Sequence, residues 1–294
     1  MYRFGGKVEI TMKNIKIVAD STCDLSPDLI KKYDISIIPL FIVLDEKSYY
    51  DGVDITPDEI YDWSNENKTT PKTAAVSFER VTETLTPFME NGDDIIFFGI
   101  SSSMSNTCNV VRLVGEQEEY NRLFVIDSQN LSTGIGLQII KAAEMAKSGR
   151  SAEEIVAEIE GARGRVRASF VVDNLTFLAR GGRCSTITAV MANTLRLHPM
   201  ITVHNGAMGA GKKFRGKIDV AILDYVNDLM SQIKNAEPER IFITHSGCSQ
   251  ELIDSVHEKL SELNYFDEIL ITRAGGVISS HCGPNTLGVL FYEK

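Results

Sequence analysis

The chain has 294 residues, of which 43% are hydrophobic, so it can bury a sizeable core in one large domain or two smaller ones. Its formal net charge of −10 disfavours a nucleic-acid partner, because proteins that bind phosphate backbones usually present a basic surface. The 5 cysteines are odd in number and widely spaced, which argues against a disulfide framework and favours a reducing, cytoplasmic location.

The first residues contain no apolar run or cleavage pattern typical of a signal peptide. We expect residues 1–14 to form a weakly ordered extension, because the periodic sequence begins at Ile15. The longest apolar run covers residues 35–44 and includes Pro39, whereas a membrane-spanning helix takes about 20 residues. We therefore expect no stable membrane insertion.

Three apolar strands each run into a loop of small hydroxyl residues. Residues 16–19 lead into Asp20-Ser21-Thr22, residues 95–100 into the serine-rich segment 101–107, and residues 123–126 into Asp127-Ser128. The carboxyl ends of strands line the ligand crevice of an open α/β sheet, so we expect these loops to share one mouth. Such a lining suits a single small anionic or carboxyl head group better than a polyphosphate.

Helix starts are well marked, and strands alternate with helices up to about residue 165. The predicted N-cap residues are Ser26, Thr56, Ser77, Ser151 and Ser249. This alternation predicts an α/β fold with a largely parallel, helix-covered sheet over residues 15–165. Residues 45–55 depart from it, because Tyr49-Tyr50 followed by Asp51-Gly52 predicts a small hairpin.

Beyond residue 165, glycine-rich breaks separate shorter strands and predict a second α+β domain with a mixed sheet over residues 166–294. Residues 206–212 have the spacing of a phosphate-binding P-loop, but Lys213 follows where a serine or threonine is required. We expect a flexible loop there, with its lysines in solvent; a nucleotide-dependent phosphotransferase stays a weak alternative. His198 lies in an apparently helical context and is expected at the surface.

Two further segments have the chemistry to contact an anion. Residues 175–183 end in a double glycine and Arg183, whose guanidinium suits bidentate contacts. Residues 275–288 combine His281 with glycines that indicate close approach of the backbone to a ligand or another chain. An apolar stripe at helical spacing lies between these segments, and a pocket lined by it would suit an amphiphile such as a fatty acid; the stripe consists of Ile187, Val190, Met191, Thr194 and Leu195.

A serine hydrolase acting on acyl esters is the alternative from another functional class. The chain has no G-x-S-x-G elbow, but a triad is defined by geometry, so Ser102 or Ser105 in the segment 101–105 with His281 stays open. A metal site is not indicated, because neither His245 with Cys248 nor His281 with Cys282 has a second ligand pair.

Six motifs, taken together and in order, resemble those of the DegV family. They are residues 20–25, Lys72-Thr73, residues 100–107, Asp127-Ser128 with Gly134 and Gly136, residues 175–183, and residues 281–284. The resemblance covers residues 15–292. It implies two domains: an α/β/α sandwich on a parallel sheet, and a smaller two-layer α+β domain. It also implies a non-catalytic lipid-binding carrier, without a cofactor, that holds a long-chain fatty acid in an apolar tunnel between these domains.

The best understood members of this family are binding subunits of a bacterial fatty acid kinase. They present the carboxyl group to a separate catalytic subunit, which makes acyl phosphate for phospholipid synthesis. Carried over to this sequence, the residues that bind the carboxyl group would be Thr73, Ser102, Ser105, Asn106 and His281. The supporting or kinase-facing residues would be Arg183, Asp20, Ser21 and Asn285. Asn106 and Asn285 replace glycines of the family pattern, and we expect both to keep a positive φ, which asparagine tolerates.

Overall fold

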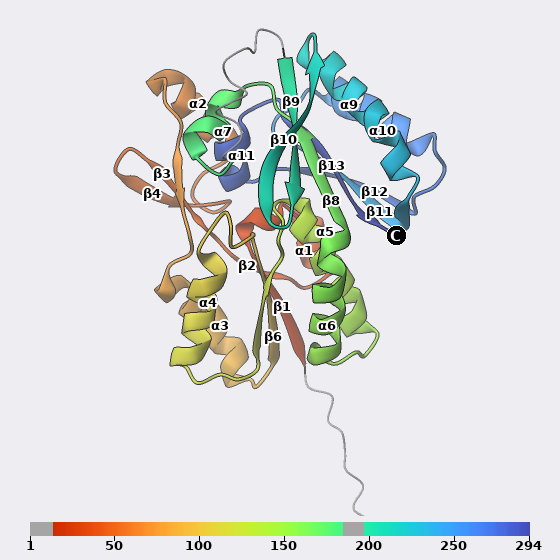
Figure 1. Ribbon diagram of the computed structural model, residues 1–294. Helices are drawn as coiled ribbons and strands as arrows, with labels where there is room; N and C mark the ends of the chain where they lie inside the picture. The colour runs from red at the N-terminus through yellow and green to blue at the C-terminus, as the bar shows by residue number, and fades with distance from the viewer. Residues whose placement is uncertain (1–13, 185–196) are drawn as a thin grey trace, which may run out of the picture.

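The computed structural model describes residues 14–184 and 197–294. These residues form three β-sheets with helices packed around them (Figure 1). The expected N-terminal extension up to residue 13 and the apolar stripe from Ile187 to Leu195 lie outside the described residues. All five predicted N-caps are confirmed, because each of these side chains accepts a hydrogen bond from the backbone three residues on.

The first sheet is parallel throughout and has four strands. In spatial order they are β2 (Ser36–Ile38), β1 (Ile15–Asp20), β6 (Asp94–Gly99) and β7 (Leu123–Asp127). Helices cover both faces of this sheet; they are α3 (Phe78–Glu90) and α4 (Thr107–Gln117) on one face, and α5 (Thr133–Lys147) and α6 (Ala152–Ala162) on the other. The predicted α/β/α sandwich is therefore present, and α1 (Pro27–Lys32) packs into the same core as α5 and α6.

The alternation of side chains along β6 explains the two helical layers. Ile95 and Phe97 are fully buried on the face of α3 and α4, whereas Ile96 and Phe98 are fully buried on the face of α5 and α6. A strand that is apolar at every position needs cover on both sides, and parallel sheets obtain it from their crossover helices. The same connections place the carboxyl ends of β1, β6 and β7 side by side.

The predicted excursion is a three-stranded antiparallel sheet. Its order is β4 (Lys47–Tyr50), β3 (Phe41–Leu44) and β5 (Lys72–Ala74), with α2 (Pro57–Asn67) between β4 and β5 in the chain. The turn that joins β3 to β4 lies at Asp45-Glu46, where Asp45 has a φ of 53°, and not at Asp51-Gly52 as the sequence suggested. Asp51 is instead buried, and its carboxylate has other partners described below.

The third sheet has six strands of mixed direction. Their order is β10 (Ala207–Arg215), β9 (Leu197–His204), β8 (Val166–Val171), β13 (Leu287–Glu293), β11 (Ala236–His245) and β12 (Glu268–Arg273). Only the β11–β12 pair is parallel among these pairings. Two helices cover one face, α9 (Ile218–Ile233) and α10 (Gln250–Ser261), as Figure 1 shows on the upper right.

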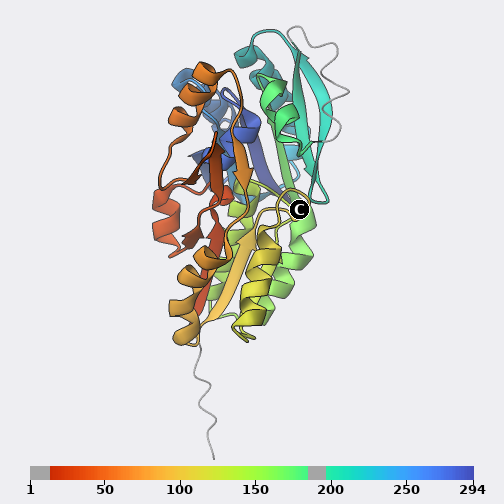
Figure 2. The same cartoon turned by 90° about the vertical axis from the view of Figure 1, so that its left-hand side faces the viewer.

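The other face of the mixed sheet packs against α5 and joins the core of the parallel sheet. Along β13, Val289 and Phe291 face α9 and α10, whereas Leu290 and Tyr292 belong to the core shared with α5. Two short helices complete this region; they are α7 (Leu175–Gly181) and α11 (Gly276–Cys282). In both views the mixed sheet lies above the parallel sheet (Figures 1 and 2). The boundary between the two predicted domains at residues 165 and 166 falls where the short 3-10 helix Arg163–Arg165 leads into β8.

Two expectations for the second half of the chain are wrong. Residues 207–215 are strand β10 rather than a flexible loop, and Lys212 forms an ion pair with Asp228. His198 is buried in β9 rather than exposed on a helix, with its ring nitrogens facing the carbonyl oxygens of Val172 and Gly216. In both cases the β9–β10 hairpin decides the conformation, through pairing that the local composition does not reveal.

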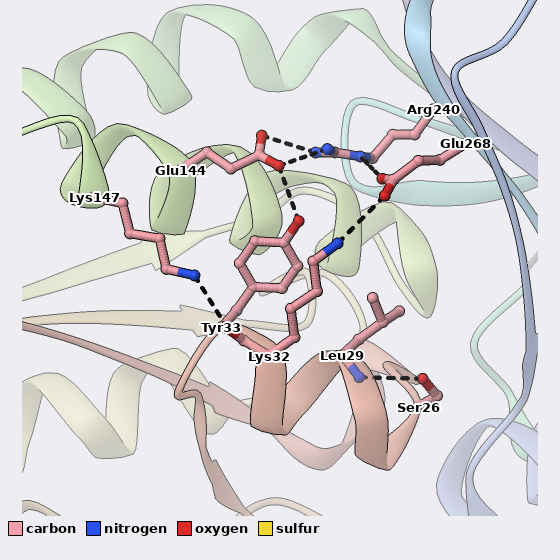
Figure 3. A network of polar contacts seen from close by, with 8 residues as sticks. All are labelled: Ser26, Leu29, Lys32, Tyr33, Glu144, Lys147, Arg240 and Glu268. Atoms are coloured by element: carbon pink, nitrogen blue, oxygen red, sulfur yellow. Dashed lines mark hydrogen bonds and ion pairs between the residues drawn. The ribbon is translucent and has the colours of Figure 1, made fainter.

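A polar network ties α1 and α5 to the edge of the mixed sheet (Figure 3). The guanidinium of Arg240 on β11 contacts both carboxylate oxygens of Glu144 on α5, at 2.6 and 3.1 Å. Its Nε donates to Glu268 on β12 at 3.3 Å, and Tyr33 after α1 donates to Glu144 at 2.9 Å. Lys32 also pairs with Glu268 at 3.3 Å, so segments distant in sequence are held together by several charged contacts. No helix within the described residues is both long and apolar enough to cross a membrane.

Candidate functional site

A narrow cavity of about 50 Å³ opens where the carboxyl end of β6 meets α11 and the three-stranded sheet. Most of its wall is apolar, and three of its polar side chains, Thr73, His281 and Arg183, lie near one another. The lining residues are Leu40, Thr73, Ala74, Ala75, Ile100, Met104, Ser105, Leu131, Arg183, Met208, Val277, Ile278, His281 and Cys282. Four of the residues predicted from the sequence are among them: Thr73, Ser105, Arg183 and His281.

The register of β5 determines where Thr73 points. Thr73 pairs with Ile42 of β3, and directly opposed residues of antiparallel strands project on the same face of a sheet. Ile42 is fully buried on the face that meets α11, since a Cβ added to Gly276 would come within 2.5 Å of its Cδ1. The hydroxyl of Thr73 is therefore presented to the same helix.

His281 lies in the last turn of α11 and meets Thr73 there. Its Nε2 is 2.8 Å from the Thr73 hydroxyl oxygen, a contact between residues 208 positions apart. Burial, together with the nearby charge of Arg183, lowers the pKa of His281 to about 4. The imidazole is therefore neutral at pH 7, with one nitrogen able to donate a hydrogen bond and the other able to accept one.

The other ring nitrogen of His281 is buried without a hydrogen-bond partner among the described residues. It faces Gly181, at the end of α7, and a Cβ built on that glycine would overlap Nδ1. Figure 1 shows α7 and α11 side by side. The double glycine read from the sequence thus has a steric reason: it lets α7 approach the imidazole closely.

Arg183 and Ser105 complete the polar end of the cavity. Arg183 is exposed to solvent although it lines the cavity, and its Nη1 donates to the Gly181 carbonyl at 2.7 Å. The Ser105 hydroxyl is 2.9 Å from the hydroxyl of Thr107 at the start of α4. Hydroxyls, a neutral imidazole and a guanidinium together can hydrogen-bond a carboxyl group from several sides.

The other predicted site residues lie outside this lining. Ser102 and Asn106 are exposed on the loop between β6 and α4, and the φ of Asn106 is −85°, so its expected positive φ is wrong. Asn285 does have a positive φ, 57°, and its amide donates to Asp173 at 3.2 Å.

Asp20 and Ser21 form part of the support behind the cavity. Asp20 is fully buried, and this burial raises the pKa of its carboxyl group to about 6. One of its oxygens accepts from the backbone N–H of Ile100 at 2.8 Å, so it holds the start of the serine loop. The Ser21 hydroxyl donates to Asp51 at 2.8 Å.

A second, smaller cavity of about 30 Å³ adjoins the first and shares three lining residues with it, Leu131, Ile278 and Cys282. Beyond these residues its wall includes Phe170, Ala274 and Leu290, with the hydroxyls of β11 and its following loop nearby. Sequence reasoning missed this wall, because its residues come from elements that only the tertiary fold brings together.

The geometry favours binding over hydrolysis. Within the described residues, no carboxylate hydrogen-bonds His281, and its Nε2 contacts a threonine rather than Ser102 or Ser105. A Ser–His–Asp arrangement needs one hydrogen bond between the histidine and the nucleophilic serine and another between the histidine and a carboxylate. The described residues also contain no group of three or more His, Cys, Asp or Glu side chains that could hold a metal ion.

Comparison with known proteins adds independent information. Residues 14–294 match a family model described as the DegV family of uncharacterised proteins. The chain is 34% identical over 287 residues to a DegV domain-containing protein of Caldanaerobacter subterraneus, covering 96% of this chain and 100% of that protein. The chain belongs to the DegV family.

Solved DegV structures show the same fold. A DegV-family protein from Thermus thermophilus, described as binding fatty acid, has a TM-score of 0.86 at 30% identity, covering 96% of this chain and 100% of that one. A stearic-acid-binding protein from Eubacterium ventriosum has a TM-score of 0.83 at 28% identity, covering 95% and 98%. The DegV fatty-acid-binding protein from Bacillus subtilis has a TM-score of 0.82 at 25% identity, covering 96% and 100%.

Proposed function

We propose that this DegV-family protein binds one long-chain fatty acid, with the carboxyl group at the Thr73–His281 pair and the acyl chain in the adjoining cavities. The observation that carries this proposal is the chemistry of the cavity: mostly apolar walls, with Thr73, His281 and Arg183 near one another. An amphiphile with a single polar head matches that distribution. Structural relatives described as binding fatty acids support the same assignment.

The carboxyl end of the ligand finds suitable partners in the cavity. Thr73 and Ser105 offer hydroxyls that donate or accept, and the neutral imidazole of His281 offers a further donor at Nε2 once that nitrogen carries the proton. A carboxylate buried without partners would be strongly unfavourable, so these groups fix where the head lies. The positive charge of Arg183 at the same end of the cavity favours the ionised form.

The acyl chain supplies most of the affinity. Burying it stabilises the complex by roughly 0.8 kcal/mol per methylene, or on the order of 10 kcal/mol for a chain of 16 carbons. Both cavities are narrow in this structure, so the acyl chain reaches the second one only when the side chains of Leu131, Ile278 and Cys282 between them move apart. The tail thus gives affinity and the head gives orientation.

We further propose that the bound fatty acid is presented, in the cytoplasm, to the catalytic subunit of a separate fatty acid kinase, which makes acyl phosphate for phospholipid synthesis. Arg183 supports this step, because it both lines the cavity and is exposed to solvent. The carboxyl group of a bound lipid lies next to it, so an approaching kinase meets the guanidinium and the reacting oxygen together.

The direct test is to purify the protein from a bacterial host, extract it with organic solvent and identify the lipid by mass spectrometry. We expect about one fatty acid per chain. The control is the Ile278→Trp variant, whose larger side chain fills the junction of the two cavities and should leave the protein folded but unloaded. A wild-type protein that is empty and also refuses added palmitate would overturn the proposal.

A further inference from the structure

Two buried carboxylates hold the beginning of α11, the helix that carries His281. Asp24, in the loop after β1, accepts a hydrogen bond from the backbone N–H of Gly275 at 2.8 Å. Asp51, after β4, accepts one from the N–H of Gly276 at 2.7 Å. Consecutive N–H groups of one helix start are therefore bound by side chains from two different segments of the first half of the chain.

The second oxygen of each carboxylate is bound by a serine hydroxyl. Ser132 donates to Asp24 at 2.5 Å, and Ser21 donates to Asp51 at 2.8 Å. Ser132 has a φ of 53° and a ψ of −143°, a conformation that costs a non-glycine residue energy and persists only where surrounding contacts impose it. Asp24 supplies such a contact, and Ser132 directly follows Leu131, which lines both cavities.

These carboxylates are held by hydrogen bonds alone. Asp24 and Asp51 are 5% and 3% exposed, and no ion pair within the described part of the chain includes either of them. Burial raises the pKa of both carboxyl groups, although their hydrogen bonds act in the opposite direction. A buried polar group that is fully hydrogen-bonded fixes geometry, whereas an unpaired one is costly, so this arrangement constrains α11 tightly.

The close approach also requires glycine at the helix start. A Cβ added to Gly276 would lie 2.8 Å from an Asp51 oxygen and 2.5 Å from Cδ1 of Ile42, and one added to Gly275 would lie 3.2 Å from an Asp24 oxygen. Ile42 is the residue that pairs with Thr73 across β3 and β5. Both ends of α11 thus contact the same three-stranded sheet, the start through Ile42 and the end through Thr73.

We propose that Asp24 and Asp51 are positioning residues for the head-group site: by fixing the start of α11, they set the position of His281 against Thr73 and against the ligand carboxyl group. This inference rests on the proposed function, since the site that they position is the fatty-acid site. Neither residue lines the cavity, so they act through the helix rather than by touching the ligand.

The test compares two ligands that share a tail, palmitate and methyl palmitate, in the Asp24→Ala and Asp51→Ala variants. Loss of one positioning hydrogen bond should lower the preference for the acid over the ester by roughly tenfold, while binding of the ester changes little. The matched control is Asp93→Ala, because Asp93 is also buried and accepts a side-chain hydrogen bond, from Asn91, at the opposite end of the parallel sheet. In this control the acid-to-ester ratio should stay at the wild-type value.

A second readout follows the imidazole itself. The ¹⁵N signals of the His281 ring should move in Asp24→Ala and Asp51→Ala and stay in place in Asp93→Ala. The Asp24→Asn and Asp51→Asn variants keep the side-chain shape and replace any alanine variant that does not fold. A folded variant with an unchanged acid-to-ester ratio and unchanged His281 signals overturns the positioning role alone. A wild-type protein that binds neither ligand overturns the proposed function instead.

Discussion

Thr73 and His281 are 208 positions apart in the chain, and their side chains meet at 2.8 Å across the boundary between the three-stranded sheet and α11. Two independent packing relationships create this contact: the register of β5 against β3, and the anchoring of α11 at its start. A change in either packing relationship would therefore alter the contact between Thr73 and His281.

Replacing Thr73 by valine should weaken fatty-acid binding, because valine keeps the shape but removes the hydroxyl that faces His281. The loss of one hydrogen bond to a charged head group corresponds to a dissociation constant roughly tenfold higher. Calorimetric titration with palmitate measures it. Thr86→Val on α3 is the control, since that hydroxyl bonds only a carbonyl of its own helix. Equal affinities for wild type and Thr73→Val would remove the hydroxyl from the head-group site.

Two glycine-to-alanine substitutions should affect different properties, one the stability of the fold and the other the affinity for palmitate. Gly161 in α6 has open space around its Cβ position, so alanine there should raise the free energy of unfolding by up to about 1 kcal/mol. Gly181 in α7 abuts the His281 ring, so alanine there should displace the imidazole and weaken palmitate binding. Urea denaturation and ligand titration of both variants provide the comparison. Unimpaired binding by Gly181→Ala would show that the ring position does not matter to the ligand.

The buried imidazole predicts a specific pH dependence of stability. His281 has a folded-state pKa of about 4, below the value near 6.5 expected when unfolded. As the pH falls through this window the unfolded chain takes up the proton first, so wild type loses up to about 3 kcal/mol of stability that is fully present above pH 6.5.

A His281→Gln variant lacks this loss, so its stability deficit relative to wild type should shrink as the pH falls from 6.5 to 4. Asp20, whose pKa is raised to about 6, acts with the opposite sign, but it is present in both proteins and cancels in the difference. Urea unfolding at several pH values measures this difference. A deficit that stays constant over the window would contradict the buried neutral imidazole.

Arg183→Ala should separate binding from presentation. The charge of Arg183 acts on the head group from an exposed position, where solvent screens it, and the guanidinium already hydrogen-bonds a protein carbonyl group. Its removal should therefore leave palmitate binding within about threefold of wild type. Acyl phosphate formation with a fatty acid kinase catalytic subunit, trapped with hydroxylamine, should fall by roughly tenfold or more. Arg112→Ala on α4, outside the cavity lining, controls for a general loss of positive charge. Unchanged turnover would exclude Arg183 from the transfer step.

The network in Figure 3 should matter more for stability than an exposed ion pair. Arg240→Met removes a largely buried guanidinium that Glu144 and Glu268 share, and we expect a loss of about 1–3 kcal/mol in the free energy of unfolding. Arg150→Met breaks an exposed pair with Glu154 and should cost less than about 0.5 kcal/mol. Thermal and urea unfolding compare the two variants, and similar losses in both would show that the network adds nothing beyond a surface pair.

The sequence predicted those features of the fold that depend on residues close together in the chain. Ser26, Thr56 and the other N-caps could be predicted because each depends on residues within one helical turn. Strands β1 and β6 could be predicted because both faces of the parallel sheet are covered, which makes these strands continuous apolar runs. Strand β10 was missed because an edge strand rich in glycine and lysine looks like a loop until its partner β9 is known. Local composition says nothing about such pairing.

The candidate site was predicted unevenly for the same reason. Family resemblance singled out Thr73, whereas the glycine-rich segment 275–288 had already pointed to His281, and the structure brings these two into contact. The apolar wall was not predicted, since Leu40, Leu131 and Met208 come from segments that share no sequence pattern and meet only in the folded chain. Asp24 and Asp51 gave no signal of their role either, because their partners are backbone N–H groups 251 and 225 residues away.

The pairing of β5 with β3 constrains the length of the loop between α2 and β5. Side chains alternate between the two faces of a strand, so inserting or deleting a single residue between α2 and Lys72 would shift β5 by one step or force the loop to absorb the change. A shift would turn Thr73 away from α11 and bring Lys72 or Ala74 to its place. Loops elsewhere on the surface can lengthen freely, whereas this one is expected to conserve its length as strictly as the threonine itself.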